Sequence, residues 1–230
     1  MSVPVSVPVI AIDGPSGSGK GTISRRVAQI LGWRLLDSGA LYRLTGLAGL
    51  RQGLSIDDQP GHARAAGAMD VEFGSTAAGG DRVLLDGEDV TQAIRTELAG
   101  ERASRVATFA PVRAALLERQ RRFAAPPGLV ADGRDMGSVV FPGAELKVFL
   151  TATAAERARR RFRQLKASGT PVTLAEVEAE IAVRDDRDTR RAASPLVQAP
   201  DAVLIDSTAM TPDAVVSEVL ALARARALAP

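Results

Sequence analysis

Residues 14–22 read Gly14-Pro15-Ser16-Gly17-Ser18-Gly19-Lys20-Gly21-Thr22, between an apolar run, Val9–Asp13, and a helical pattern over Thr22–Leu31. The spacing G-x-x-x-x-G-K is that of a phosphate-binding loop, in which small residues let the backbone curl so that its N–H groups point at phosphate oxygens. The following helix adds its positive N-terminal end, and Lys20 adds a mobile cation. A plain glycine turn would explain the glycines but not a lysine at this spacing between a strand and a helix. We therefore expect residues 14–22, called the phosphate loop below, to bind a nucleotide.

The residue after Lys20 departs from the general pattern. It is Gly21, where most phosphate loops carry a Ser or Thr that contacts magnesium. We expect the contact with Mg²⁺ to pass to Thr22, to a carboxylate or to water. Two carboxylates that end apolar runs, Asp37 and Asp132, are placed to organise the ion directly or through water.

Composition narrows the chemistry by what it omits. The chain of 230 residues has no cysteine, one histidine and no asparagine. Thiol nucleophiles, cysteine-ligated zinc, the N-K-x-D guanine-reading motif and the magnesium-binding Asn of protein kinases are therefore excluded. His62 stands in a polar segment and is expected at the surface. The remaining carboxylates, arginines, lysines and hydroxyls suit phosphoryl transfer, which needs positioning and charge neutralisation.

Charge and hydropathy favour a globular chain without a membrane segment. The formal net charge is +2 and the two signs are interspersed, which does not indicate a polyanion-binding tail. Residues 1–8 lack basic side chains and contain Pro4 and Pro8, unlike a signal peptide. No apolar run approaches the roughly 20 residues needed to cross a bilayer. We expect a cytoplasmic protein that is a monomer.

Short apolar runs alternate with helical periodicity, the pattern of a parallel sheet covered by helices on both faces. The expected strands are Val9–Asp13, Arg34–Asp37, Leu129–Asp132, Leu146–Thr151 and Val203–Asp206. The expected helices are Thr22–Leu31, Gly39–Leu50, Arg102–Phe123, Ala154–Lys166, Leu174–Arg191 and Pro212–Ala227. Several strands end in Asp, which either gathers near a ligand crevice or caps the next helix. Capping is the role expected of Asp206.

The alternation of apolar runs and helical periodicity is interrupted between residues 57 and 100. Met69–Gly74 and Arg82–Gly87 alternate with the period of two that is typical of strands, and predict an antiparallel hairpin inserted into the α/β core. The insertion is either a substrate-covering subdomain or a decorated surface loop.

Four further segments accompany the phosphate loop. They are LLDSGALYR at 35–43, ADGRDMGSVVFPGA at 131–144, the arginine-rich helix at 157–163 and RDDRDTRRAASPL at 184–196. In the last, Arg184, Asp188 and Arg191 are spaced i, i+4, i+7 and would share one helix face. Taken alone, such a face is as well explained by a solvated ladder of ion pairs, and the arginine-rich helix by a solvated face.

The phosphate loop, LLDSGALYR, ADGRDMGSVVFPGA and RDDRDTRRAASPL together, in order and spacing, resemble the bacterial cytidylate kinases from about Val9 to nearly the C-terminus. The resemblance implies an α/β nucleoside monophosphate kinase fold, with a parallel five-stranded sheet flanked by helices, an inserted antiparallel-β/helix subdomain and a short lid. Its implied boundaries are a core of residues 1–64 and 104–230, an insertion at 65–103 and a lid at 154–168. It also implies Mg²⁺ with ATP as the phosphoryl donor and CMP or dCMP as acceptor.

The resemblance also assigns residues. ATP would bind to residues 14–22 and to the lid arginines Arg157, Arg160 and Arg161. CMP would bind to Ser38, Tyr42, Arg43, Ser104, Arg113, Arg134, Asp135, Arg184, Asp188 and Arg191. Among these, Arg43 and Arg134 would hold the acceptor phosphate with Arg191 nearby, and Arg184 and Asp188 the sugar. Lys20, Arg134 and Arg191 would be catalytic.

Base recognition can be checked against elementary chemistry. The resemblance places Ser104, Arg113 and Asp135 at cytosine. Cytosine carries an amine donor where uracil carries an acceptor. A carboxylate at Asp135 would accept from that amine and repel uracil's oxygen, while Arg113 can donate to the ring nitrogen and carbonyl.

Two other kinds of function compete. A kinase with AMP or UMP as acceptor would differ only in its base pocket. A nucleic-acid-binding ATPase would usually interleave aromatic residues with its basic ones, and the arginine-rich helix has only Phe162. A pure interaction module would leave the phosphate loop unused. We expect no nucleic acid partner.

Overall fold

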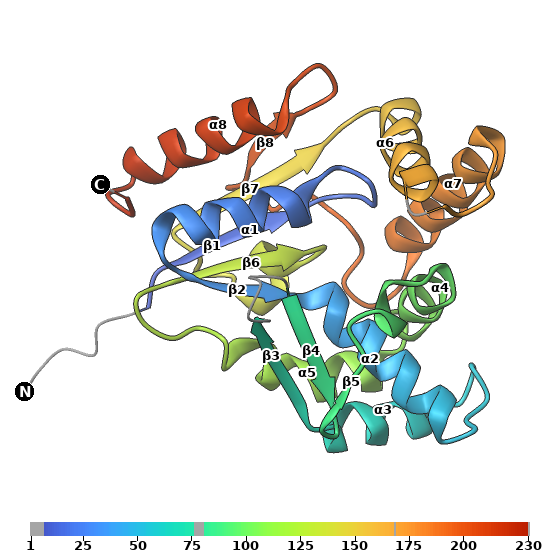
Figure 1. Cartoon of the computed structure of the whole chain (residues 1–230). Helices are drawn as coiled ribbons and strands as arrows, with labels where there is room; N and C mark the ends of the chain where they lie inside the picture. Colours follow the sequence, from blue (N-terminus) through green and yellow to red (C-terminus); the bar gives the residue numbers. More distant parts are fainter. Residues whose placement is uncertain (1–6, 76–80, 168, 230) are drawn as a thin grey trace, which may run out of the picture. The chain divides into compact units, whose positions relative to one another are not determined.

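The computed structural model describes residues 7–75, 81–167 and 169–229. The described residues up to 37 and from 120 onward form the larger of two compact units, and those between 38 and 119 form the smaller one. The larger unit contains a parallel sheet of five strands in the order β2-β6-β1-β7-β8 (Figure 1). The strands are β1 (Val9–Asp13), β2 (Arg34–Asp37), β6 (Leu129–Gly133), β7 (Leu146–Thr151) and β8 (Val203–Asp206). The predicted strands and their parallel arrangement are confirmed.

Two helices pack against apolar side chains of this sheet. Ile10 and Ile12 of β1 are fully buried in a cluster with Val27 of α1 (Lys20–Leu31) and Val219 of α8 (Pro212–Arg224). Burying such side chains contributes about 1.5–3 kcal/mol each. β1 is the central strand of the sheet, and the phosphate loop follows it directly.

Two further helices of the larger unit pack on each other. They are α6 (Ala154–Ala167) and α7 (Leu174–Arg190), which share a small apolar cluster around Ala158 and Ile181. Thr173 begins α7 with a capping box, in which its side chain accepts from the N–H of Glu176 and the carboxylate of Glu176 accepts from the N–H of Thr173. The segment predicted as a lid, residues 154–168, includes α6; its closure stays a prediction.

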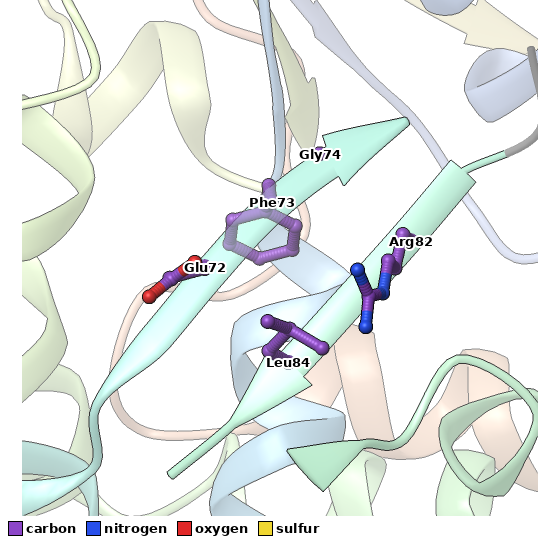
Figure 2. A pocket seen from close by; sticks show the side chains of 5 residues that line it. All are labelled: Glu72, Phe73, Gly74, Arg82 and Leu84. Carbon is purple, nitrogen blue, oxygen red and sulfur yellow. The ribbon is translucent and has the colours of Figure 1, made fainter. Parts of the chain in front are cut away.

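The smaller unit combines helices with an antiparallel sheet. Its helices are α2 (Ser38–Arg51), α3 (Gln59–Ala68), a short 3₁₀ turn (Ala93–Arg95), α4 (Glu97–Val106) and most of α5 (Ala110–Arg121). Strands β3 (Val71–Ser75) and β4 (Asp81–Leu85) pair antiparallel and confirm the predicted hairpin, and the two-residue β5 (Glu88–Asp89) extends it. Figure 2 shows the side chains that line a small pocket on this hairpin: Glu72, Phe73, Gly74, Arg82 and Leu84. The predicted insertion, residues 65–103, lies within the smaller unit, and its boundaries stay a prediction.

The single helix predicted over Arg102–Phe123 is wrong. The chain forms α4 and α5 instead, with a break at residues 107–109. Pro111 explains the break, because a proline in a helix interior lacks the N–H donor and its ring collides with the carbonyl four residues earlier. At the second residue of α5 the same proline is tolerated.

The expectation that His62 lies at the surface is also wrong. His62 belongs to α3, is fully buried, and its Nδ1 lies 2.8 Å from the carbonyl oxygen of Asp58. Gly49 makes the space, since a Cβ at that position would lie 2.5 Å from His62 Nε2. A polar sequence context therefore concealed a core residue.

Asp206 does not cap a helix as predicted. Thr211 is the N-cap of α8, and Asp206 instead accepts hydrogen bonds from the backbone and hydroxyl of Thr208. No helix among the described residues is long and apolar enough to span a membrane.

Candidate functional site

The phosphate loop leaves β1 and curls through left-handed backbone. Gly17 and Gly19 have φ of 75° and 92°, a region that residues with a Cβ rarely adopt. Helix α1 then begins at Lys20, and no side chain caps it at Gly19. The N–H of Thr22 donates to the carbonyl oxygen of Gly19 at 3.0 Å, so the helix end offers a ligand the N–H groups that precede it, and anions favour such an end.

Lys20 is buried within the loop. Its Nζ donates to the carbonyl oxygen of Pro15 at 3.1 Å. Burial, reinforced by the guanidinium of Arg134 and opposed by Asp132, lowers the pKa of Lys20 to about 7. A phosphate beside the ammonium would offset this loss of solvation and favour the charged form.

Carboxylates gather where the strands end. Asp37 and Asp132 are register partners on the neighbouring strands β2 and β6. Burial raises the pKa of Asp132 to about 7, with Lys20 opposing and Asp37 reinforcing the rise. The Asp132 Oδ1 atom is buried and has no hydrogen-bond partner among the described residues.

This arrangement fits a magnesium ion held mainly by substrate. Mg²⁺ is usually bound through one or two carboxylates together with phosphates and water. The described residues contain no group of three or more His, Cys, Asp or Glu that could hold a metal ion by themselves. Asp132 explains why glycine stands at position 21, where the motif has Ser or Thr. A Cβ at that position would lie 3.2 Å from Asp132 Oδ2.

Asp13 fixes the loop that follows β6, a role that the sequence reasoning missed. Its two carboxylate oxygens accept hydrogen bonds from the backbone N–H groups of Met136 and Gly137, each at 2.8 Å. These residues open a π-helical turn, Met136–Val140, directly after Asp135. Asp13 thus determines where the segment carrying Arg134 and Asp135 lies. The available signal was an acid at the end of a buried strand.

Arginines and acids of the predicted CMP site lie close together within the larger unit. Arg134 Nε donates to Asp188 Oδ2 at 2.9 Å, and Arg191 lies 4.0 Å from Asp135 Oδ1. Burial opposes ionisation of Asp188, yet Arg134, Arg184 and Arg191 together hold its pKa below the usual range. The predicted helix reaches only Arg190, and Arg191 is its extended C-cap.

The smaller unit carries the other predicted CMP-binding residues. Arg43 donates to the carbonyl oxygen of Ile94 at 2.7 Å. The guanidinium of Arg113 lies 5.8 Å from the centre of the Tyr42 ring, within the range of a cation–π contact. Ser38 and Ser104 are both buried.

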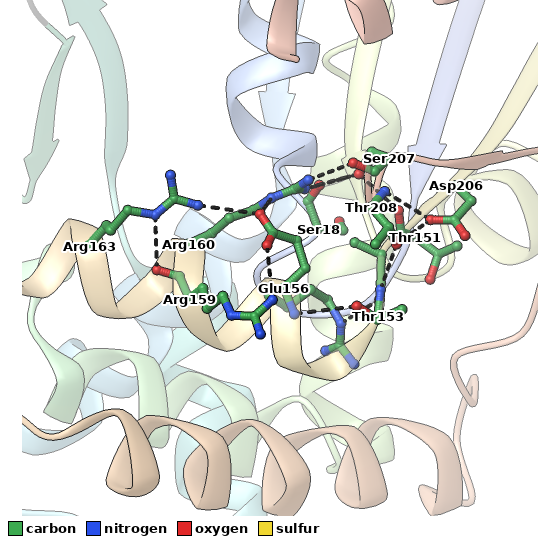
Figure 3. A network of polar contacts seen from close by, with 12 residues as sticks. Ser18, Thr151, Thr153, Glu156, Arg159, Arg160, Arg163, Asp206, Ser207 and Thr208 are labelled. Carbon is green, nitrogen blue, oxygen red and sulfur yellow. Dashed lines mark hydrogen bonds and ion pairs between the residues drawn. The ribbon is translucent and has the colours of Figure 1, made fainter. Parts of the chain in front are cut away.

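The predicted lid arginines differ from one another. Arg157 is buried and pairs with Asp185 of α7, whereas Arg160 bonds to Glu156 and Ser207 (Figure 3). Arg161 donates to the side chain of Gln164.

The sequence profile of the family described as Cytidylate kinase matches residues 10–225. The chain belongs to the cytidylate kinase family. It is 56% identical over 217 residues to a cytidylate kinase of Pseudomonas syringae pv. tomato, covering 94% of this chain and 95% of that protein. It is 54% identical over 222 residues to a cytidylate kinase of Azotobacter vinelandii, covering 96% and 97%.

A solved gluconokinase from Sinorhizobium meliloti 1021 is more distant from this family member. The two are 18% identical, with a TM-score of 0.48 over 95% of this chain and 93% of that one. The family assignment rests on the sequence matches, which span nearly the whole chain.

Proposed function

We propose that this chain transfers the γ-phosphoryl group of ATP to CMP or dCMP, giving ADP and CDP or dCDP. The observation that carries the proposal is the cluster of cations at the strand ends, where buried Lys20 of the phosphate loop lies near Arg134. Such a cluster is well suited to stabilise the charge on the phosphoryl group during its transfer. Family membership supplies the donor and acceptor.

The reaction needs no general base. The phosphate of CMP is already largely ionised at neutral pH, because its second pKa is about 6, so its oxygen can attack the γ-phosphorus directly. Lys20 would neutralise charge on the donor phosphates, and Arg43, Arg134 and Arg191 charge on the acceptor. The chain's one histidine is buried in α3, and this mechanism gives it no part.

Mg²⁺ is the proposed companion of ATP. When bound, it would neutralise part of the charge on the donor phosphates. The unpartnered Oδ1 of Asp132 supports that residue as the main holder, with Asp37 and Thr22 beside it, directly or through water.

Substrate selection would follow from complementary charge. Asp135 accepts from the amine of cytosine, and Ser104 and Arg113 complete the reading of the base. Asp188, held ionised by its arginine neighbours, can accept hydrogen bonds from sugar hydroxyls, with Arg184 beside it. Gly14 to Thr22 and the lid arginines would hold ATP. We propose a monomer that works in the cytoplasm, where both substrates occur, without a nucleic acid partner.

The direct test of this reaction monitors the phosphate groups by ³¹P nuclear magnetic resonance. ³¹P spectra of a mixture of purified protein, Mg²⁺, ATP and CMP should show the resonances of ADP and CDP growing together. Growth of inorganic phosphate without CDP would identify an ATPase and overturn the proposal.

A further inference from the structure

Two arginines of α6 donate hydrogen bonds to the main chain of the phosphate loop. Arg157 donates from NH1 to the carbonyl oxygen of Ser16 at 3.0 Å, and Arg160 from NH1 to that of Ser18 at 3.2 Å. Their targets are alternate residues of the loop. Helix α6 lies more than a hundred residues further along the chain, so the loop's conformation is set in part from outside its own sequence.

These bonds have a consequence for the N–H groups that follow. A trans peptide is planar, and its C=O and N–H point in opposite directions. Fixing the Ser16 carbonyl toward Arg157 therefore aims the N–H of Gly17 away from α6. In the same way, Arg160 fixes the Ser18 carbonyl and therefore aims the N–H of Gly19 away from α6. Gly17 and Gly19, like Gly14, have positive φ, a conformation that other residues rarely adopt, so an external restraint on these peptides helps to define the loop.

Both guanidinium groups are themselves held. Arg157 is 5% exposed, and its other donors reach the carbonyl oxygen of Ala152 at 3.0 Å and both carboxylate oxygens of Asp185 at 3.0 and 2.6 Å. Arg160 donates to Glu156 at 3.0 Å, to the hydroxyl of Ser207 at 3.0 Å and to its carbonyl oxygen at 2.6 Å (Figure 3).

The hydrogen-bond inventory limits what these arginines can offer to ATP. A guanidinium has five N–H donors. Each of these two makes four hydrogen bonds to protein atoms within the described residues. One N–H of each is left, too little for the two-pronged grip by which arginine usually holds phosphate.

Packing joins the helix to the loop as well. A Cβ on Gly17 would lie 3.1 Å from Arg157 Cβ and 3.2 Å from the Arg157 carbonyl oxygen. The first turn of α6 thus rests directly against the loop. Ser207, which has no part in the predicted site, completes the support by donating to the carbonyl oxygen of Thr151 at 2.9 Å.

We propose that Arg157 and Arg160 are positioning residues that aim the N–H groups of Gly17 and Gly19 at the phosphates of ATP, and that Asp185 and Ser207 hold them in place. The role rests on the proposed function. It refines the expectation of direct ATP binding, because the two guanidiniums act through the loop's main chain and are in place before ATP arrives. Direct contact with ATP from α6 then falls to Arg161.

The test compares the full chain with Arg157→Met and Arg160→Met, using Arg163→Met as the matched control. Arg163 is on the same helix and also pairs with Glu156, but its side chain is 69% exposed. Amide spectra of the ¹⁵N-labelled protein without nucleotide report the loop directly. Affinities for ATP, for inorganic tripolyphosphate and for CMP report what the loop does.

The proposal predicts that Arg157→Met moves the amide resonance of Gly17 and Arg160→Met that of Gly19 before any nucleotide is added. Each variant should weaken ATP and tripolyphosphate roughly tenfold, as expected for loss of an oriented donor, and leave the CMP affinity within twofold. Arg157→Lys, which keeps the cation but not the fork, should lie between Arg157→Met and the unaltered chain. The control should resemble the unaltered chain.

Unmoved amides together with weakened ATP binding would show that the arginines contact ATP directly, and would overturn the proposal. Equal loss of CMP and ATP affinity would indicate general unfolding and would also contradict it. If the unaltered chain fails to phosphorylate CMP but the amide and tripolyphosphate results hold, the proposed function falls and the positioning role stands.

Discussion

Asp13, the last residue of the central strand, accepts a hydrogen bond from the backbone N–H of Gly137, 124 residues further along the chain, at 2.8 Å. The same carboxylate accepts from Met136. Asp13 therefore ties the start of the phosphate loop to the segment that carries Arg134 and Asp135. Residues of the larger unit that are proposed to bind ATP and CMP thus share one buried carboxylate as their anchor.

Replacing Asp13 by Asn should change how stability depends on pH. Burial raises the pKa of Asp13 to about 6, from 3.8, although the two N–H bonds oppose the rise. The folded state thus holds this proton more tightly than the unfolded state, so the stabilisation is complete below about pH 4 and is lost as the pH rises through 6. The loss is roughly 3 kcal/mol.

Urea unfolding of both proteins at pH 4 and pH 6.5 measures this effect. The free energy of unfolding of Asp13→Asn should decline less across that interval, because Asp13 no longer titrates and because its charge no longer helps to raise the pKa of Asp132. Identical declines would mean that Asp13 keeps an ordinary pKa.

Lys20→Ala should lower turnover about 10²- to 10³-fold while leaving the fold intact, because removal of one preorganised charge at a developing anion has effects of that size. Initial rates of ADP formation and far-UV circular dichroism measure the two expectations. Lys166→Ala is the matched control, since Lys166 is exposed and lies 5.6 Å from the Phe162 ring. Near-normal turnover of Lys20→Ala would remove Lys20 from the chemistry.

Asp135→Asn should erode the preference for CMP over UMP by roughly 10- to 100-fold, the range expected for one discriminating contact to a base. An amide can turn its N–H toward the oxygen of uracil, whereas a carboxylate repels it. The ratio of kcat/KM for the two acceptors is the measurement, with Asp186→Asn, at an exposed position of α7, as control. An unchanged ratio would exclude Asp135 from reading the base.

Gly21→Ala should raise the Mg²⁺ concentration that gives half-maximal rate by about tenfold, a magnitude typical of changes beside a metal ligand. The added Cβ would lie 3.2 Å from Asp132 Oδ2, so the carboxylate has to move. Rates titrated with Mg²⁺ at fixed ATP report the effect. Gly143→Ala, where an added Cβ meets no atom within 4 Å, should leave the titration as it is, and an identical curve for Gly21→Ala would contradict the role of Asp132.

The sequence predicts the parallel core well because its strands are short apolar runs that end at a polar or turn-forming residue, such as Val9–Asp13 before the phosphate loop. Local sequence patterns gave wrong predictions where a single residue or a distant partner determines the structure. Pro111 breaks a helix whose periodicity continues across it, and His62 is buried because distant Gly49 leaves room for its ring.

The candidate site likewise has features that the sequence predicts and features that appear only in the folded chain. The loop and the acidic and basic motifs are contiguous and could be identified from the sequence. The supports of Arg160 were not visible, because Ser18 and Ser207 approach it only in the folded chain. Residues that act on the loop from outside leave no spacing rule in a single sequence.

The acceptor is identified by the rate of ADP formation from Mg·ATP, with CMP, dCMP, UMP, AMP and no acceptor compared in one coupled assay. We predict rapid ADP formation confined mainly to CMP and dCMP. Comparable turnover without an acceptor, or a preference for AMP, would contradict the account while leaving the phosphate loop as a nucleotide site.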